Sequence, residues 1–185
     1  MSLLELFLIA IGLSMDAFAV AICIGLTSSK ATLKKALIVG AYFGVFQAIM
    51  PIIGYMLAKG FADKISAFDH WIAFVLLCFI GGKMIVESFK KEDNVVSGEK
   101  SLSPATMLPL AFATSIDALA IGVSFAFLNV SIVPAALLIG VVTFILSVAG
   151  LKIGKSFGAK FKSKAELTGG IILVLIGFKI LVEHL

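Results

Sequence analysis

The sequence predicts an all-α integral membrane protein with six transmembrane helices, arranged as two inverted repeats of three helices. Three observations lead to this prediction. Hydrophobic residues make up 61% of the 185 residues, charged residues only 14%, and the mean hydropathy is +1.15. Soluble domains carry about 25% charged residues. Six apolar runs are long enough to cross a bilayer, and the first three runs resemble the last three.

Each apolar run can span about 30 Å of hydrocarbon at a rise of 1.5 Å per residue of helix. None of the runs alternates with a period of two, and a single helix satisfies its own backbone in lipid where an open strand cannot. The first run has no basic region before it and no cleavage-site pattern, so we expect it to be retained as a span. The predicted spans are residues 3–26, 36–58, 71–89, 105–128, 132–151 and 167–184.

The lysines between the spans predict the orientation of the chain. Most lysines lie in the first, third and fifth gaps, whereas the opposite side contains only Lys59 and Lys64. By the positive-inside rule, the lysine-rich gaps are cytoplasmic and both termini lie outside. The lysine-rich side carries Lys30, Lys34, Lys35, Lys90, Lys91, Lys100, Lys155, Lys160, Lys162 and Lys164.

The two halves of the chain share two motifs. SMDAFAV at 14–20 matches SIDALAI at 115–121, and IGGKMIVE at 80–87 matches IGFKILVE at 176–183. Glycines in the second and fifth spans also correspond, Gly40 and Gly54 to Gly140 and Gly154. Internal repeats of this kind indicate that one structural unit is used twice.

The repeat divides the chain into a first unit at residues 1–89, a cytoplasmic linker at 90–104 and a second unit at 105–185. Because three spans is an odd number, the second unit must enter the membrane from the opposite side. Transporters with such inverted repeats hold their substrate near the midplane, where the repeats meet.

Asp16 and Asp117 occupy matching positions inside the first and fourth spans, about ten residues or roughly 15 Å from the cytoplasmic end of the helix. A charged carboxylate at that depth costs about 2.5 to 3.5 kcal/mol. Lys83 and Lys179 are the lysines within the predicted spans. A glutamate follows each four positions later near a helix end, which favours snorkelling to the interface. A proton or a bound cation is therefore the expected means of neutralising the aspartates.

The oxygen donors near the aspartates indicate which cation could bind. Carboxylate, hydroxyl, amide and carbonyl oxygens suit Mg²⁺, Ca²⁺ or Mn²⁺, whereas Zn²⁺, Cu and Ni²⁺ would call for imidazole or thiolate. Both histidines lie at span ends, and the two cysteines lie in apolar runs without metal-site spacing. The candidate donors besides the aspartates are Ser14, Gln47, Thr114 and Ser115.

The chain resembles the bacterial manganese efflux pumps of the MntP type, which are distantly similar to the lysine exporter superfamily. The resemblance rests on SMDAFAV, GVFQAIMPIIGY at 44–55, HWIAFVLL and GGKMIVE between 70 and 87, ATSIDALAIGV at 113–123 and KAELTGG at 164–170. It implies a multi-pass protein of the bacterial plasma membrane that exports Mn²⁺, with Asp16 and Asp117 as the leading site residues.

The resemblance also bears on two further residues. Some relatives are acidic at the position of Gln47, so the amide here lowers the negative charge of the site by one. Glu166, at the start of the sixth span, is a further candidate for metal binding. A glutamate in the first turn of a helix is equally expected from the helix dipole.

The predicted function is export of Mn²⁺ by alternating access, with Asp16 and Asp117 holding the ion and protons as a possible counter-substrate. Manganese is then the transported substrate and no cofactor is expected. Open alternatives are a sporulation-type membrane protein of the same family, an exporter of another divalent cation or of an amino acid, and a membrane scaffold. An enzyme is not expected, because no paired nucleophile and base and no phosphate-binding glycine loop are present. The absence of arginine and the placement of lysine in the gaps argue against a nucleic-acid partner.

Overall fold

The computed structural model describes residues 1–28, 32–65 and 102–157, together with isolated residues between 71 and 89 and between 167 and 182. Its long helices are α1 (Leu3–Thr27), α2 (Leu33–Ile65), α4 (Pro104–Phe127) and α5 (Ile132–Phe157). All four are long and apolar enough to cross a membrane, and the parts of the chain listed above contain no strand. The prediction of an all-helical membrane protein is thereby confirmed.

The isolated residues belong to the predicted third and sixth spans. Those from Trp71 to Val86 and from Leu167 to Val182 are helical, and the rings of Phe74 and Phe178 lie edge to face, with centroids 5.0 Å apart. The remaining residues of these two spans, and residues 90–101 of the linker, lie outside the described residues.

The helix ends follow from local sequence. Ser2 caps α1, because its hydroxyl accepts a hydrogen bond from the Glu5 amide while the Glu5 carboxylate accepts one from the Ser2 amide. Pro104 occupies the first turn of α4, where its missing N–H costs no hydrogen bond. Helix α2 continues past the predicted span end at residue 58 to Ile65. Charged residues therefore end the apolar stretch without ending the helix.

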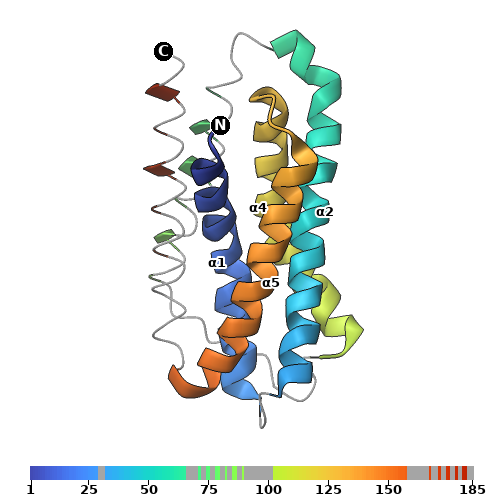
Figure 1. Ribbon diagram of the computed structural model, residues 1–185, viewed down its shortest axis with the longest axis vertical. Coiled ribbons are helices and arrows are strands. Elements are labelled where there is room, and N and C mark those ends of the chain that lie inside the picture. The colour runs from blue at the N-terminus through green and yellow to red at the C-terminus, as the bar shows by residue number, and fades with distance from the viewer. Residues whose placement is uncertain are drawn as a thin grey trace.

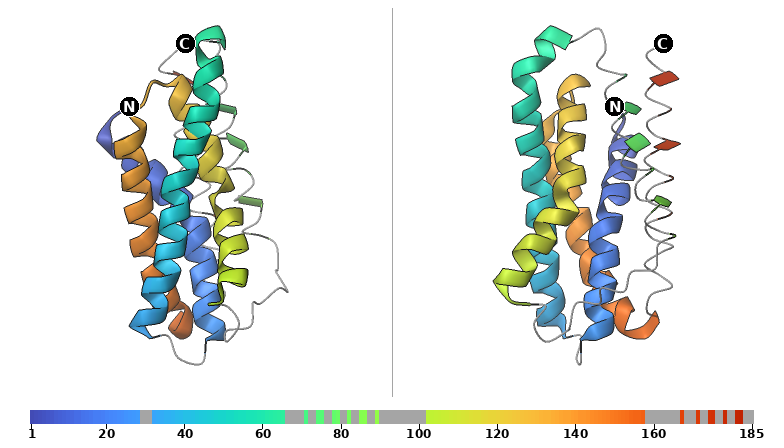
Figure 2. Two further views of the ribbon diagram at one scale, coloured as in Figure 1. Left: turned by 90° about the vertical axis from the view of Figure 1, so that its right-hand side faces the viewer. Right: turned by 180° about the vertical axis from the view of Figure 1, so that it is seen from behind.

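The four helices do not pack in sequence order. α1 and α5 run in one direction and α2 and α4 in the other (Figure 1). α1 packs along α5, and α2 packs against both α4 and α5, whereas α1 barely touches α2 and α4 barely touches α5. The views in Figure 2 show the same arrangement from the side and from behind. The spatial order is thus α1, α5, α2, α4, and each predicted repeat packs mainly on the other.

Glycines allow these cross-repeat contacts to be close. A β-carbon at Gly122 of α4 would overlap the Pro51 carbonyl of α2, and one at Gly54 of α2 would overlap the Leu119 carbonyl of α4. Glycines bring α1 and α5 together in the same way, since a β-carbon at Gly154 would overlap the backbone of α1. Small residues at helix contacts let backbones approach closely in membranes, where packing rather than the hydrophobic effect drives association.

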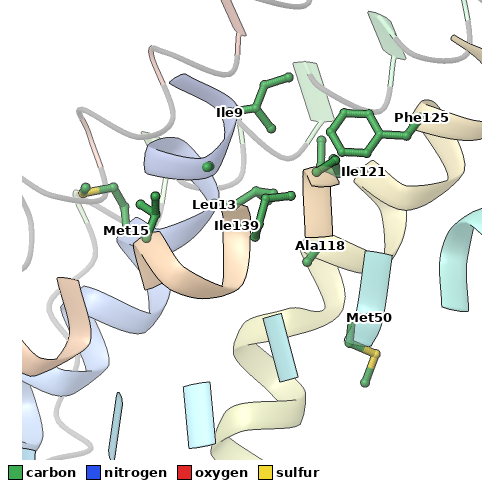
Figure 3. Close-up of a cluster of buried hydrophobic side chains, with 11 residues drawn as sticks. Ile9, Leu13, Met15, Met50, Ala118, Ile121, Phe125 and Ile139 are labelled. Carbon is green, nitrogen blue, oxygen red and sulfur yellow. The ribbon is translucent and has the colours of Figure 1, made fainter. Parts of the chain in front are cut away.

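Two apolar clusters fill the interior of the bundle. The upper cluster, near the start of α1, draws on all four helices. Figure 3 shows Ile9, Leu13, Ile139, Ile121 and Phe125 in its middle, with Met15 and Met50 at its margins. The lower cluster does the same near the end of α1. The upper cluster consists of Ile9, Ala10, Leu13, Met15, Met50, Ala118, Ile121, Phe125, Ala135, Ile139 and Val142. The lower cluster consists of Ala17, Ala21, Ile24, Ala36, Val39, Phe43, Met107, Ala111 and Leu151.

Candidate functional site

A layer of polar side chains lies between the upper and lower clusters. On α2 it falls between Phe43 and Met50, on α4 between Ala111 and Ala118, and on α5 between Val142 and Leu151. On α1 the layer lies where the upper cluster ends at Met15 and the lower cluster begins at Ala17. We call this set the polar layer; it consists of Ser14, Asp16, Gln47, Thr114, Ser115, Asp117, Thr143 and Ser147.

Two hydroxyls join α1 to α5 within the polar layer. Ser14 and Thr143 are both fully buried, and their Oγ and Oγ1 atoms lie 2.7 Å apart. Ser14 Oγ also lies 2.6 Å from the Ala10 carbonyl oxygen, to which it donates its single proton. Thr143 therefore donates to Ser14, and a chain of two hydrogen bonds ends on the backbone of α1.

Gln47 reaches across the interior of the bundle from α2 to α1. Its Nε2 atom donates to the Leu13 carbonyl oxygen at 3.0 Å, and the side chain is only 1% exposed. A carbonyl accepts only from the amide nitrogen, so this bond fixes the orientation of the amide and turns its oxygen away from Leu13. Gln47 and Ser14 thus contact the same turn of α1.

The two aspartates lie midway along α1 and α4. Asp117 is buried at 8% exposure, and Asp16 is half-buried. Asp16 follows Ser14 by two positions, which is about 200° around a helix. The same spacing separates Asp117 from Ser115. Each carboxylate therefore projects from the face of its helix opposite the neighbouring serine. Ser14 bonds to Thr143, and Gln47 bonds to the carbonyl of the adjacent Leu13.

The remaining candidate donors bond to their own helix. Thr114 Oγ1 lies 3.0 Å from the Leu110 carbonyl oxygen, and Ser115 Oγ lies 2.9 Å from that of Phe112. Donation of the proton leaves the lone pairs of each hydroxyl oxygen able to face a cation. Glu166 lies outside the described residues.

The ligand chemistry of the polar layer is that of a hard cation site. In the described part of the chain, no group of three or more His, Cys, Asp or Glu side chains is placed to hold a metal ion. A cation bound in this layer would therefore combine the aspartates with hydroxyl, amide or backbone oxygens. Oxygen-only ligand sets suit Mn²⁺, Mg²⁺ and Ca²⁺.

Comparison with known proteins identifies the family of the chain. The family profile described as "Putative manganese efflux pump" matches residues 30–181. The chain is 54% identical over 185 residues to a protein of Acetivibrio thermocellus, covering all of this chain and 93% of the relative. The chain belongs to the MntP family. The relative is named "Putative manganese efflux pump MntP".

Two other members of the MntP family are similarly close. The relative from Desulfitobacterium hafniense is 56% identical over 182 residues, covering 98% of this chain and 95% of its own length. The relative from Mannheimia succiniciproducens is 51% identical over 184 residues, covering 100% and 98%. Both carry the same name as the Acetivibrio protein. No solved structure matches this chain.

Sequence reasoning missed two members of the polar layer in this MntP chain, Thr143 and Ser147. Isolated hydroxyls are common in apolar helices, so neither residue stands out by composition. The repeat could have identified Ser147, because the spacing that relates Gly40 to Gly140 also relates Gln47 to Ser147. Thr143 has no polar counterpart in the first repeat, since Phe43 occupies that position.

Proposed function

We propose that this protein exports Mn²⁺ from the cytoplasm by alternating access through the polar layer. The observation that carries the proposal is a group of buried polar side chains, contributed by all four helices, at the level between two apolar clusters; it comprises Ser14, Gln47, Ser115, Asp117, Thr143 and Ser147. An apolar cluster is a barrier to a hydrated ion, because taking a charge out of water without compensation is costly. An ion held between two such barriers is released to one side when one barrier opens.

Asp16 and Asp117 supply the negative charge in this proposal. Away from the helix ends, they are the carboxylates of the four described helices. Two carboxylates balance one divalent cation, and two protons returning on the same carboxylates keep the site near neutral in both directions. The choice of manganese and the outward direction follow the names of the family and of the relatives.

The inverted repeat is part of the same proposal. Helices α1 and α4, which carry the matching aspartate motifs, run in opposite directions, as do α2 and α5 (Figure 1). The repeat relates α1 to α4 and α2 to α5. The contact of α1 with α5 therefore corresponds to the contact of α4 with α2, and both contacts are extensive. This is the pattern expected of two copies related by a two-fold axis in the membrane plane.

The packing also favours particular moving units. Glycines bring the backbones closest together between α1 and α5 and between α2 and α4. The glycine contacts between α2 and α5 are wider, with 2.9 Å from the β-position of Gly44 to the Gly140 carbonyl oxygen, and α1 and α4 touch only sparsely. We therefore propose that the α1–α5 pair rocks against the α2–α4 pair along the α2–α5 contact. Each moving unit then contains one helix from each repeat. The two repeats therefore do not move against each other as whole units.

Manganese content and manganese tolerance test the proposal in cells that lack their own exporter. The wild type should lower cell manganese, and Asp16→Asn and Asp117→Asn should each abolish the effect at matched membrane levels. Glu5→Gln is the matched control. It neutralises a buried carboxylate in the N-terminal cap of α1, outside the polar layer, and glutamine preserves the capping box.

The outcomes separate the parts of the proposal. Export by the wild type and by Glu5→Gln, with loss in both aspartate variants, supports the proposed site. Export by the aspartate variants at the wild-type level would remove the carboxylates from the mechanism. Unchanged manganese in cells with the wild type would overturn manganese as the substrate.

A further inference from the structure

We propose that Ser147 of α5 is an additional ion-contacting residue of this transporter. In this proposal its hydroxyl oxygen contacts a hard divalent cation, or a water of that cation, on the lysine-rich side of the Ser14–Thr143 pair. The inference rests on the proposed function and extends it to a residue that neither the repeat motifs nor the family names assign.

The contacts of α5 show where Ser147 points. Thr143, one turn before it, bonds to Ser14 of α1, and a β-carbon at Gly150, one turn after it, would meet Phe18 of α1. Its neighbour Val148 faces Gly40 of α2. Ser147 therefore lies on the edge of α5 between the face that contacts α1 and the face that contacts α2. That edge is turned to the centre of the four-helix bundle.

The Ser147 hydroxyl differs from the other buried hydroxyls within the described helices; Ser28, which shares its unpartnered state, lies at the C-terminal cap of α1. Ser147 is 0% exposed, and its Oγ atom has no hydrogen-bond partner among the described residues. A serine within a helix ordinarily satisfies its hydroxyl on a carbonyl three or four residues back. Ser14, Ser115 and Ser124 all do so. Ser147 is turned away from that bond, and a buried polar group without a partner is unfavourable.

A cation passing through the bundle would satisfy this hydroxyl. Ser147 lies below Thr143 along α5 and above Leu151 of the lower cluster, so it is the polar side chain of α5 nearest the lower cluster. In the repeat register it corresponds to Gln47, which projects into the bundle from α2. The two residues thus offer oxygens to the interior from the neighbouring helices α2 and α5.

The test is the dissociation constant of Mn²⁺ for the purified full-length protein in detergent micelles, measured together with its thermal unfolding temperature. Ser147→Ala should raise the constant about tenfold, the lower end of the effect of removing a supporting group at a metal site. It should not lower the unfolding temperature, since the lost hydroxyl makes no hydrogen bond in the described structure. Ser124→Ala is the matched control, a buried serine outside the polar layer that bonds to the Ala120 carbonyl.

A second variant gives a chemical signature. Ser147→Cys places a soft thiol at the same position and should shift the preference from Mn²⁺ towards Cd²⁺. A Mn²⁺ affinity in Ser147→Ala equal to that of Ser124→Ala, with no change of preference in Ser147→Cys, would overturn the proposal. So would a lowered unfolding temperature with unchanged affinity, which would mark a structural role. If the wild type exports Mn²⁺ but the Ser147 variants give either of these contrary results, the proposed function stands and only the role of Ser147 is lost.

Discussion

The hydroxyls of Ser14 and Thr143, 129 positions apart in the chain, lie 2.7 Å from each other in the interior of the bundle. Both side chains are fully buried. The bond links the first helix of one predicted repeat to the second helix of the other, at the level where the two apolar clusters meet. It therefore marks both the contact between the repeats and the candidate site.

Thr143→Val should destabilise the protein by about 1 kcal/mol, because the isosteric side chain removes a buried hydrogen bond while Ser14 keeps its bond to the Ala10 carbonyl. An SDS-unfolding titration in mixed micelles measures the change. Thr143→Ser keeps the hydroxyl and is the control. A loss in Thr143→Ser as large as in Thr143→Val would assign the effect to the methyl group.

Gly122→Ala should destabilise the bundle by about 1 to 3 kcal/mol, as expected for overpacking. The added methyl group would meet the Pro51 carbonyl of α2, a backbone atom that cannot move aside without shifting the helix. Gly60→Ala is the control, because a β-carbon there has nothing within 4 Å. The unfolding temperatures of the two variants give the comparison, and equal values would contradict the close approach of α2 and α4.

Gln47→Glu should lower the Mn²⁺ dissociation constant about tenfold, or about 1.4 kcal/mol. The new carboxylate faces the Leu13 carbonyl oxygen, which repels it until a cation or proton lies between them. Gln47→Met, similar in length but without the amide, should weaken binding. Calorimetric titration of the purified variants measures both constants. Weaker binding by Gln47→Glu than by the wild type would exclude Gln47 from the neighbourhood of the ion.

A disulfide between α1 and α5 tests the proposed moving units. Ser14→Cys with Thr143→Cys should form the bond readily, in a chain whose Cys23 and Cys78 have been replaced by serine. Manganese transport in proteoliposomes should be the same for the oxidised and reduced forms of this variant, since both helices belong to one unit. Arrest of transport on oxidation would instead favour movement of one repeat against the other.

The sequence predicted the helices more fully than their arrangement. Apolar length and composition anticipated α1 and α4 to within a few residues, because a membrane span must match the bilayer thickness. The ends of α2 and α5 were missed, since both helices continue past the apolar stretch into charged residues. Gln47 is buried, in keeping with the general tendency of polar residues within a span to face the protein interior, and its contact with an ion stays a prediction.

The parts that could not be predicted depend on contacts between distant segments. Ser14 was named as a candidate oxygen donor near Asp16, and its contact with an ion stays a prediction. The partner of Ser14 is Thr143, which only the packing of α1 on α5 identifies. Whether Asp16, Asp117, Ser115, Thr114 and Glu166 contact an ion remains a prediction for the transport experiments.

The cross-repeat packing also bears on how the chain is made. During synthesis α1 and α2 enter the membrane first, yet the described helices on which they pack most closely, α5 and α4, are translated later. Until α5 emerges, the glycine-lined faces of α1 and α2 must be solvated by lipid. Tertiary assembly is therefore a late event, completed only after most of the chain has left the ribosome.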